Sequence, residues 1–154
     1  MSNFSQALGS KFNKDALRIR SFEFNGHTFK VKIPLTAESD AMFERLKTPD
    51  QELVEKFYQD MSKNFTEESD SVKITDNDVI IEGRSIREAA ESKVLIQARV
   101  TEMIRLLVPE EADFDMSTVN YEMIDELFPF AVQIQLMEFI GETVSPSYNA
   151  TKGK

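Results

Sequence analysis

The chain has 154 residues, of which 41% are hydrophobic and none is cysteine, and its formal net charge is −9 with a pI near 4.7. This length suffices for one domain with its own core, and the hydrophobic fraction is that of an ordinary globular protein. The absence of cysteine excludes disulfides and thiolate chemistry, the acidic balance disfavours nucleic acid as a partner, and no apolar run predicts a membrane span or a signal peptide.

The first 16 residues are rich in Ser, Asn and Gln, and we expect them to form a mobile N-terminal arm. Residues 20–33 then predict a β-hairpin, because Asn25-Gly26 between two alternating runs favours a two-residue turn. This turn pairs Phe22 with Phe29. The register places five apolar side chains on one face, which we expect to be buried against helices: Phe22, Phe24, Phe29, Val31 and Ile33.

Helical spacing and capping residues predict four to five helices after this hairpin. Thr48 and Pro49 are interpreted as the N-cap and first residue of one helix, and Ser85 with Glu88 as a capping box that opens the longest helix. A second short hairpin is expected at about 72–82. The helices are predicted at about 36–47, 49–65, 86–108, 119–127 and 128–144.

These elements predict an α+β fold that is mainly α-helical, with one globular domain over residues 17–144. The polar residues 145–154 are expected to form a flexible C-terminal tail.

No catalytic, cofactor-binding or metal-binding residue is predicted. His27 is the only histidine and has no acidic neighbour in the sequence to orient it, so it is interpreted as a strand residue. The run Asp76-Asn77-Asp78 lacks the glycine and the distant glutamate of a calcium loop, which favours a simple turn. A small hydrolase with an unrecognised carboxylate pair is the least favoured of the functions considered.

The last predicted helix is apolar around most of its circumference, and this width exceeds what one contact with a core requires. Two explanations remain open. The helix can be enclosed within the domain, or part of its surface can bind a partner. Under the second hypothesis the leading partner-binding residues are Phe130, Ile134, Met137 and Phe139.

The segment 125–140 reads Asp-Glu-Leu-Phe-Pro-Phe-Ala-Val-Gln-Ile-Gln-Leu-Met-Glu-Phe-Ile, an acidic helix, a proline break and an apolar helix. This segment, with the order of elements over most of residues 20–144, resembles the tail assembly chaperones of long, non-contractile-tailed bacteriophages. The resemblance lies in pattern and order rather than in an invariant motif. It implies a non-enzymatic protein of the host cell cytoplasm that binds and solubilises the tape measure protein, helps to recruit tail tube protein, self-associates and is absent from the mature virion.

The family resemblance also implies a longer form, made by ribosomal frameshifting, that carries the main contacts to the tail tube protein. Lys152-Gly153-Lys154 can be encoded by three G, three A and a final G, a run on which a ribosome can step back one base. A charged, frayed chain end explains the same residues without frameshifting. The alternative function is a cytoplasmic adaptor or regulatory protein that binds one folded partner through its C-terminal helix.

Overall fold

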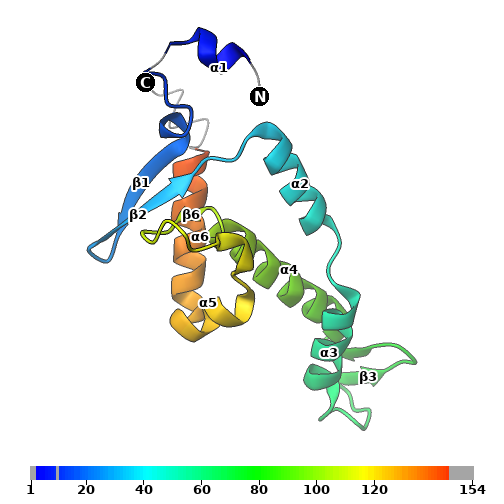
Figure 1. Cartoon of the computed structure of the whole chain (residues 1–154). Coiled ribbons are helices and arrows are strands. Elements are labelled where there is room, and N and C mark those ends of the chain that lie inside the picture. The colour runs from blue at the N-terminus through cyan, green and yellow to red at the C-terminus, as the bar shows by residue number, and fades with distance from the viewer. Residues whose placement is uncertain (1–2, 10, 146–154) are drawn as a thin grey trace, which may run out of the picture. The chain divides into compact units, whose positions relative to one another are not determined.

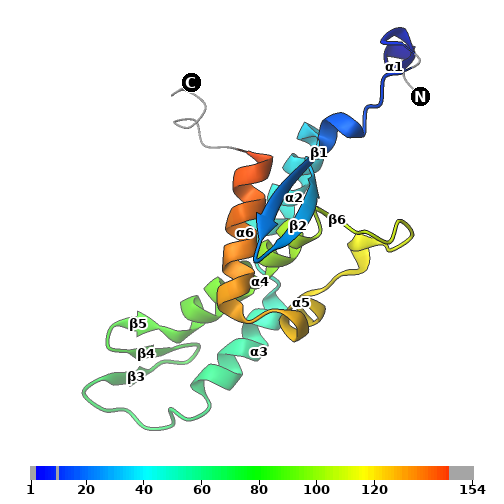
Figure 2. The ribbon, with the colours of Figure 1, turned by 90° about the vertical axis from the view of Figure 1, so that its left-hand side faces the viewer.

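The structure, a computed structural model, describes residues 3–9 and 11–145. In this part of the chain it contains six α-helices and two antiparallel three-stranded sheets (Figures 1 and 2). The fold is therefore α+β and mainly α-helical, as predicted. The chain divides into two compact units: the first joins the residues up to Ser39 with those from Thr101 onward, and the second spans residues 40–100. The single domain over 17–144 stays a prediction.

The first unit contains the predicted hairpin, formed by β1 (Ile19–Phe24) and β2 (His27–Lys32). Asn25 and Gly26 have φ angles of 50° and 80°, the conformation that a two-residue turn requires. Phe22 lies opposite Phe29. The turn and the register are confirmed.

The longest helix, α4 (Ile86–Ile104), ends earlier than the predicted Val108. The following residues form β6 (Leu107–Val108), which pairs with β2 and makes the hairpin a three-stranded sheet. The Lys32 amide donates a hydrogen bond to the Leu106 carbonyl at 2.8 Å. The helical prediction was wrong here because a lone hairpin is marginally stable and its edge strand gains backbone hydrogen bonds from a third strand.

The last helix, α6 (Phe130–Val144), packs against β1 and β2 (Figure 2). The Phe139 ring lies 5.7 Å from the Phe22 ring in a stacked arrangement. Val31 is fully buried, whereas the hairpin phenylalanines are half-buried. A short helix, α5 (Tyr121–Leu127), precedes α6 and follows a 3-10 turn, η2 (Met116–Thr118). The buried hydrophobic residues of this unit are Val31, Ile104, Val119, Ile124, Leu136 and Ile140.

The second unit contains α3 (Gln51–Ser62), which begins two residues later than predicted. Its N-cap is Asp50, whose carboxylate accepts hydrogen bonds from the amides of Glu52 and Leu53, and not Thr48. Aspartate is as effective an N-cap as any residue, and its charge favours the helix N-terminus. The helix before it, α2 (Thr36–Lys47), crosses the boundary between the units and has the predicted span.

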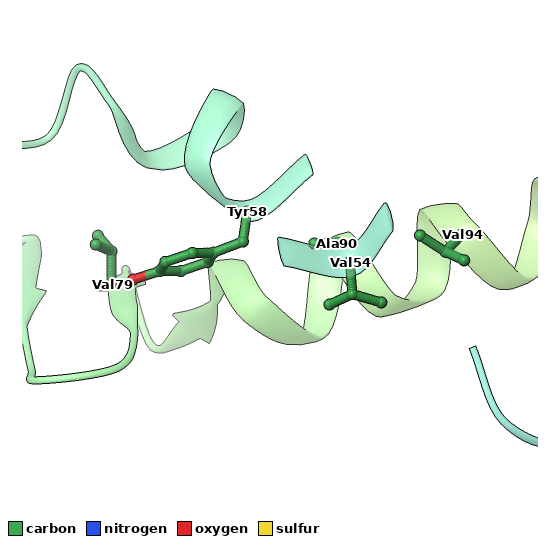
Figure 3. Packing of buried hydrophobic residues seen from close by; sticks show 5 residues of the cluster. All are labelled: Val54, Tyr58, Val79, Ala90 and Val94. Carbon is green, nitrogen blue, oxygen red and sulfur yellow. The ribbon is translucent and has the colours of Figure 1, made fainter. Parts of the chain in front are cut away.

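The second predicted hairpin is confirmed as β3 (Val72–Ile74) and β4 (Val79–Ile81). A third strand that the sequence did not predict, β5 (Arg84–Ser85), pairs with β4 across a turn at Glu82 and Gly83. The core of this unit lies between α3, α4 and this sheet (Figure 3). Its buried residues are Val54, Tyr58, Val79, Ala90 and Val94.

The predicted N-terminal arm contains a helix, α1 (Asn3–Ala7), and leads into a 3-10 turn, η1 (Ala16–Arg18). The mobility of the arm stays a prediction. In the predicted C-terminal tail only Ser145 belongs to the described residues. Lys152-Gly153-Lys154 lies outside them.

Candidate partner-binding surface

The described residues include no group of three or more His, Asp or Glu side chains arranged to hold a metal ion. None of the described helices combines the length and the apolar character that a bilayer span needs. His27 is exposed, and its ring packs edge-on against Phe29 with 4.5 Å between the ring centres. The residues that the sequence singled out for partner binding all lie on α6.

The buried side of α6 consists of Gln133, Leu136 and Ile140, which recur at helical spacing and are all fully buried. Part of the wide apolar surface noted in the sequence is therefore enclosed within the unit. The four candidate residues lie outside this buried side and keep accessible surface. Phe130 is 52% exposed and Phe139 is 44% exposed, whereas Ile134 and Met137 are half-buried.

The structure separates two of these candidates by their surroundings. Phe139 packs on the hairpin, with its ring stacked on Phe22 and edge-on to Phe24 at 5.5 Å. Phe130 is the first residue of α6 and keeps half of its surface exposed beside Pro129. Phe139 therefore has a structural role in holding the hairpin, and Phe130 is the stronger candidate for contact with a partner.

Two further exposed apolar residues lie on α5, at positions that the sequence analysis did not single out. Met123 is 40% exposed and Leu127 is 72% exposed. They are four residues apart on a helix and so lie on one face. Leu127 and Phe130 are three residues apart, which limits the distance between their Cα atoms to about 11 Å. We call Met123, Leu127 and Phe130 the α5–α6 corner.

Sequence reasoning missed the α5 residues because their helix is short and three of its seven residues are charged. The apolar pair Met123 and Leu127, four residues apart, was the available signal. An apolar pair of this kind normally faces the core. Here Ile124 faces the core instead, since it is the buried residue of α5.

Hydrogen bonds to the buried side chain of Gln133 hold α5 against α6. The Gln133 side chain accepts a hydrogen bond from the Tyr121 hydroxyl at 2.7 Å and donates to Asp125 at 3.1 Å and to the Phe128 carbonyl at 2.9 Å. Burial raises the pKa of Tyr121 above its usual value, although the hydrogen bond to Gln133 opposes this rise. The exposed residues of the corner thus belong to two helices that these hydrogen bonds join.

The chain around this corner is uniformly acidic. Residues 106–145 contain nine acidic residues and no basic one. On α5 itself, Glu122, Asp125 and Glu126 are all exposed. A surface of this charge repels nucleic acid and favours partners with basic groups. The exposed apolar residues of the corner thus lie in a strongly acidic stretch of chain.

Comparisons of this chain with protein-family models, with curated proteins and with solved structures find no match. Its function is therefore inferred from the sequence and from the chemistry of this surface.

Proposed function

We propose that this protein is a phage tail assembly chaperone, which binds the tape measure protein in the host cell cytoplasm and keeps it soluble until the tail is built. In this role it also helps to recruit tail tube protein and is absent from the mature virion. The observation that carries the proposal is the exposed α5–α6 corner, an apolar surface within a strongly acidic stretch of chain.

The chemistry of this corner suits a long apolar client. Leu127 and Phe130 offer side chains that can cover an apolar helical segment. The surrounding carboxylates remain in water and give the complex a negative charge, which opposes aggregation. One corner is too small for tight binding, so several copies along one client would supply the affinity through repetition.

Co-expression with the tape measure protein of the same phage tests this proposal directly. The wild-type chain is expected to keep that protein in the soluble fraction and to co-purify with it. The double variant Leu127→Ser, Phe130→Ser is expected to lose most of this effect while keeping its fold. Phe43→Ser is the matched control, since Phe43 is 60% exposed and belongs to the second unit, whereas the corner belongs to the first.

Two results would contradict the proposal. One is a tape measure protein that is equally soluble with the corner variant and with the wild type. The other is a gene neighbourhood without tail genes, since a chaperone of this family is encoded between the tail tube and tape measure genes.

The gene sequence also tests the frameshifted form. The codons of Lys152, Gly153 and Lys154 are expected to spell the slippery purine run, followed by an open reading frame of domain length in the shifted frame. A broken run, or a stop codon immediately downstream in that frame, rules out frameshifting at this position.

A further inference from the structure

The turn between β1 and β2 carries a pair of residues that can react with each other. The sequence contains seven asparagines, of which Asn25 alone is followed by a glycine. Asn25 and Gly26 are both exposed at the end of the hairpin (Figure 1). Apart from the adjoining residues, no atom lies within 4 Å of the position that a Cβ would take at Gly26. Water and hydroxide can therefore reach this pair.

Neither reacting group of the pair is held by another part of the protein. In the described part of the chain, no hydrogen bond joins the Asn25 carboxamide or the Gly26 amide to a partner. The strand pairing ends with Phe24 opposite His27, so the two turn residues lie outside the ladder. The side chain of Asn120, in contrast, accepts a hydrogen bond from a backbone amide at 3.0 Å. The Asn25 side chain can therefore rotate toward the Gly26 nitrogen without losing a bond.

We propose that Asn25 is a site of spontaneous deamidation in the folded protein. Hydroxide removes the proton of the Gly26 amide, and the Gly26 nitrogen then attacks the Asn25 Cγ atom. A new C–N bond closes a five-membered succinimide, the bond from Cγ to the side-chain nitrogen breaks, and that nitrogen takes a proton from water and leaves as ammonia. Water opens the ring at either carbonyl, which gives aspartate or isoaspartate at this position. Glycine favours the ring closure because it has no side chain beside the attacking nitrogen.

The isoaspartate product is expected to loosen the hairpin, because it adds one methylene to the backbone of a two-residue turn. The length of this turn fixes the register in which Phe22 lies opposite Phe29. The same Phe22 ring stacks on Phe139 of α6 at 5.7 Å, so a change in the turn also affects the contact with this helix. The aspartate product leaves the backbone unaltered and suits the same type of turn. Both products add one negative charge, but only isoaspartate changes the backbone.

Peptide mapping by mass spectrometry tests this site in the full chain after several days at neutral and at mildly alkaline pH. The tryptic peptide of residues 21–30 contains Asn25 as its only asparagine. Its mass is expected to change by the loss of ammonia and the gain of water, at a rate proportional to the hydroxide concentration. The isoaspartate product is expected to be labelled by a protein isoaspartate methyltransferase. The rate should lie within about tenfold of that in a synthetic peptide of residues 21–30, because the turn can open without breaking a ladder hydrogen bond.

Two comparisons test the role of the glycine. Asn64 is exposed as Asn25 is, but the side chain of Phe65 follows it, so we expect Asn64 to convert at least about tenfold more slowly in the same sample. Gly26→Ala is expected to slow the conversion of Asn25 by a similar factor, because the added methyl group hinders the ring closure.

Urea denaturation tests the effect on the hairpin. Ion-exchange chromatography isolates the converted chains by their added negative charge. This fraction, which contains isoaspartate, is expected to unfold at a lower urea concentration than the Asn25→Asp variant, which carries the same charge on an unaltered backbone.

Four outcomes would overturn the inference. Asn25 could convert more than about tenfold more slowly in the protein than in the synthetic peptide, which would mean that the fold protects the turn. Asn64, or Asn25 in the Gly26→Ala variant, could convert as fast as Asn25 in the wild type. The converted fraction could also be as stable as Asn25→Asp. None of these measurements involves a client, so the modification site and the chaperone proposal can fail independently.

Discussion

The Tyr121 hydroxyl donates a hydrogen bond of 2.7 Å to the side-chain carbonyl of Gln133, and this bond joins α5 to α6 within the first unit. Gln133 is fully buried on a helix whose other buried residues are apolar. Its amide group uses both its acceptor and its donor, so its burial leaves no polar atom unsatisfied. The position of the α5–α6 corner thus depends on a polar side chain.

Replacing Gln133 by an apolar side chain of similar size should therefore destabilise the protein. Gln133→Leu leaves the Tyr121 hydroxyl and the Phe128 carbonyl without this partner, and we expect a loss of about 3 kcal/mol in the free energy of unfolding. Urea denaturation measures the change. Gln135→Leu, an exposed position on the same helix, should change stability by less than about 0.5 kcal/mol. Equal urea midpoints for the Gln133→Leu and Gln135→Leu variants would show that the hydrogen bonds of Gln133 contribute nothing to stability.

Substitution of Phe139 should mainly lower the stability of the protein, and substitution of Phe130 should mainly weaken client binding. Phe139→Ala removes the ring contacts with Phe22 and Phe24, and we expect it to lower the free energy of unfolding by about 2 kcal/mol although the residue is 44% exposed. Phe130→Ala should lower it by less than about 0.5 kcal/mol and yet weaken client binding. Thermal denaturation paired with the co-purification assay measures both effects. A stable Phe139→Ala variant would contradict the role of its ring in holding the hairpin.

Two glycine-to-alanine changes should act in opposite directions. Gly26→Ala introduces a side chain at a φ of 80°, so we expect a loss of about 1 kcal/mol even though no atom lies within 4 Å of the added Cβ. Gly141→Ala places a Cβ 3.6 Å from the Met103 Cε atom within α6, an ordinary contact, and should raise stability by about 0.5–1 kcal/mol because alanine favours the helix. Chemical denaturation measures the change in the free energy of unfolding for each variant. A loss of stability in Gly141→Ala would show that the Met103 side chain cannot move to accept the added Cβ.

The carboxylate of Asp78 should make the protein lose stability as the pH becomes acidic. Burial alone raises the pKa of Asp78, but hydrogen bonds from the Ser85 hydroxyl and from the Arg87 and Val79 amides outweigh burial and lower it below its usual value of 3.8. A lowered pKa in the folded state means that the stabilisation is complete above the unfolded value. It is lost as the pH falls through the folded value.

The test of this pH dependence is Asp78→Asn, which keeps the shape and removes the charge at the start of α4. We expect the variant to be less stable than the wild type by about 1–2 kcal/mol at pH 7, and the difference to shrink below about pH 4. Asp76→Asn, in the same turn and exposed, serves as the control. A difference that stays constant from pH 7 to pH 3 would contradict the role of the charged carboxylate.

Local patterns in the sequence were sufficient for the hairpin and for the starts of α2 and α4, whereas α3, α5 and α6 each begin two residues later than predicted. The Asn25-Gly26 turn needs positive φ at both residues, and few residue pairs other than Asn-Gly adopt it readily, so the register of Phe22 and Phe29 followed from the turn alone. The N-cap at Ser85 could also be predicted from the sequence, because its hydroxyl accepts a hydrogen bond from the Glu88 amide only three residues further along the chain. These features depend on neighbours along the chain.

Tertiary contacts decided what the sequence could not. Leu107 and Val108 continue a helical pattern, yet they form β6 because the edge of β2 offers backbone hydrogen bonds from a distant part of the chain. The sequence places Gln133 within an apolar helix, but only the tertiary structure brings Tyr121 and Asp125 to its amide. Met123 and Leu127 are exposed because Ile124 occupies the core side of α5. A sequence determines which side chains share a face, whereas burial depends on which face a distant element covers.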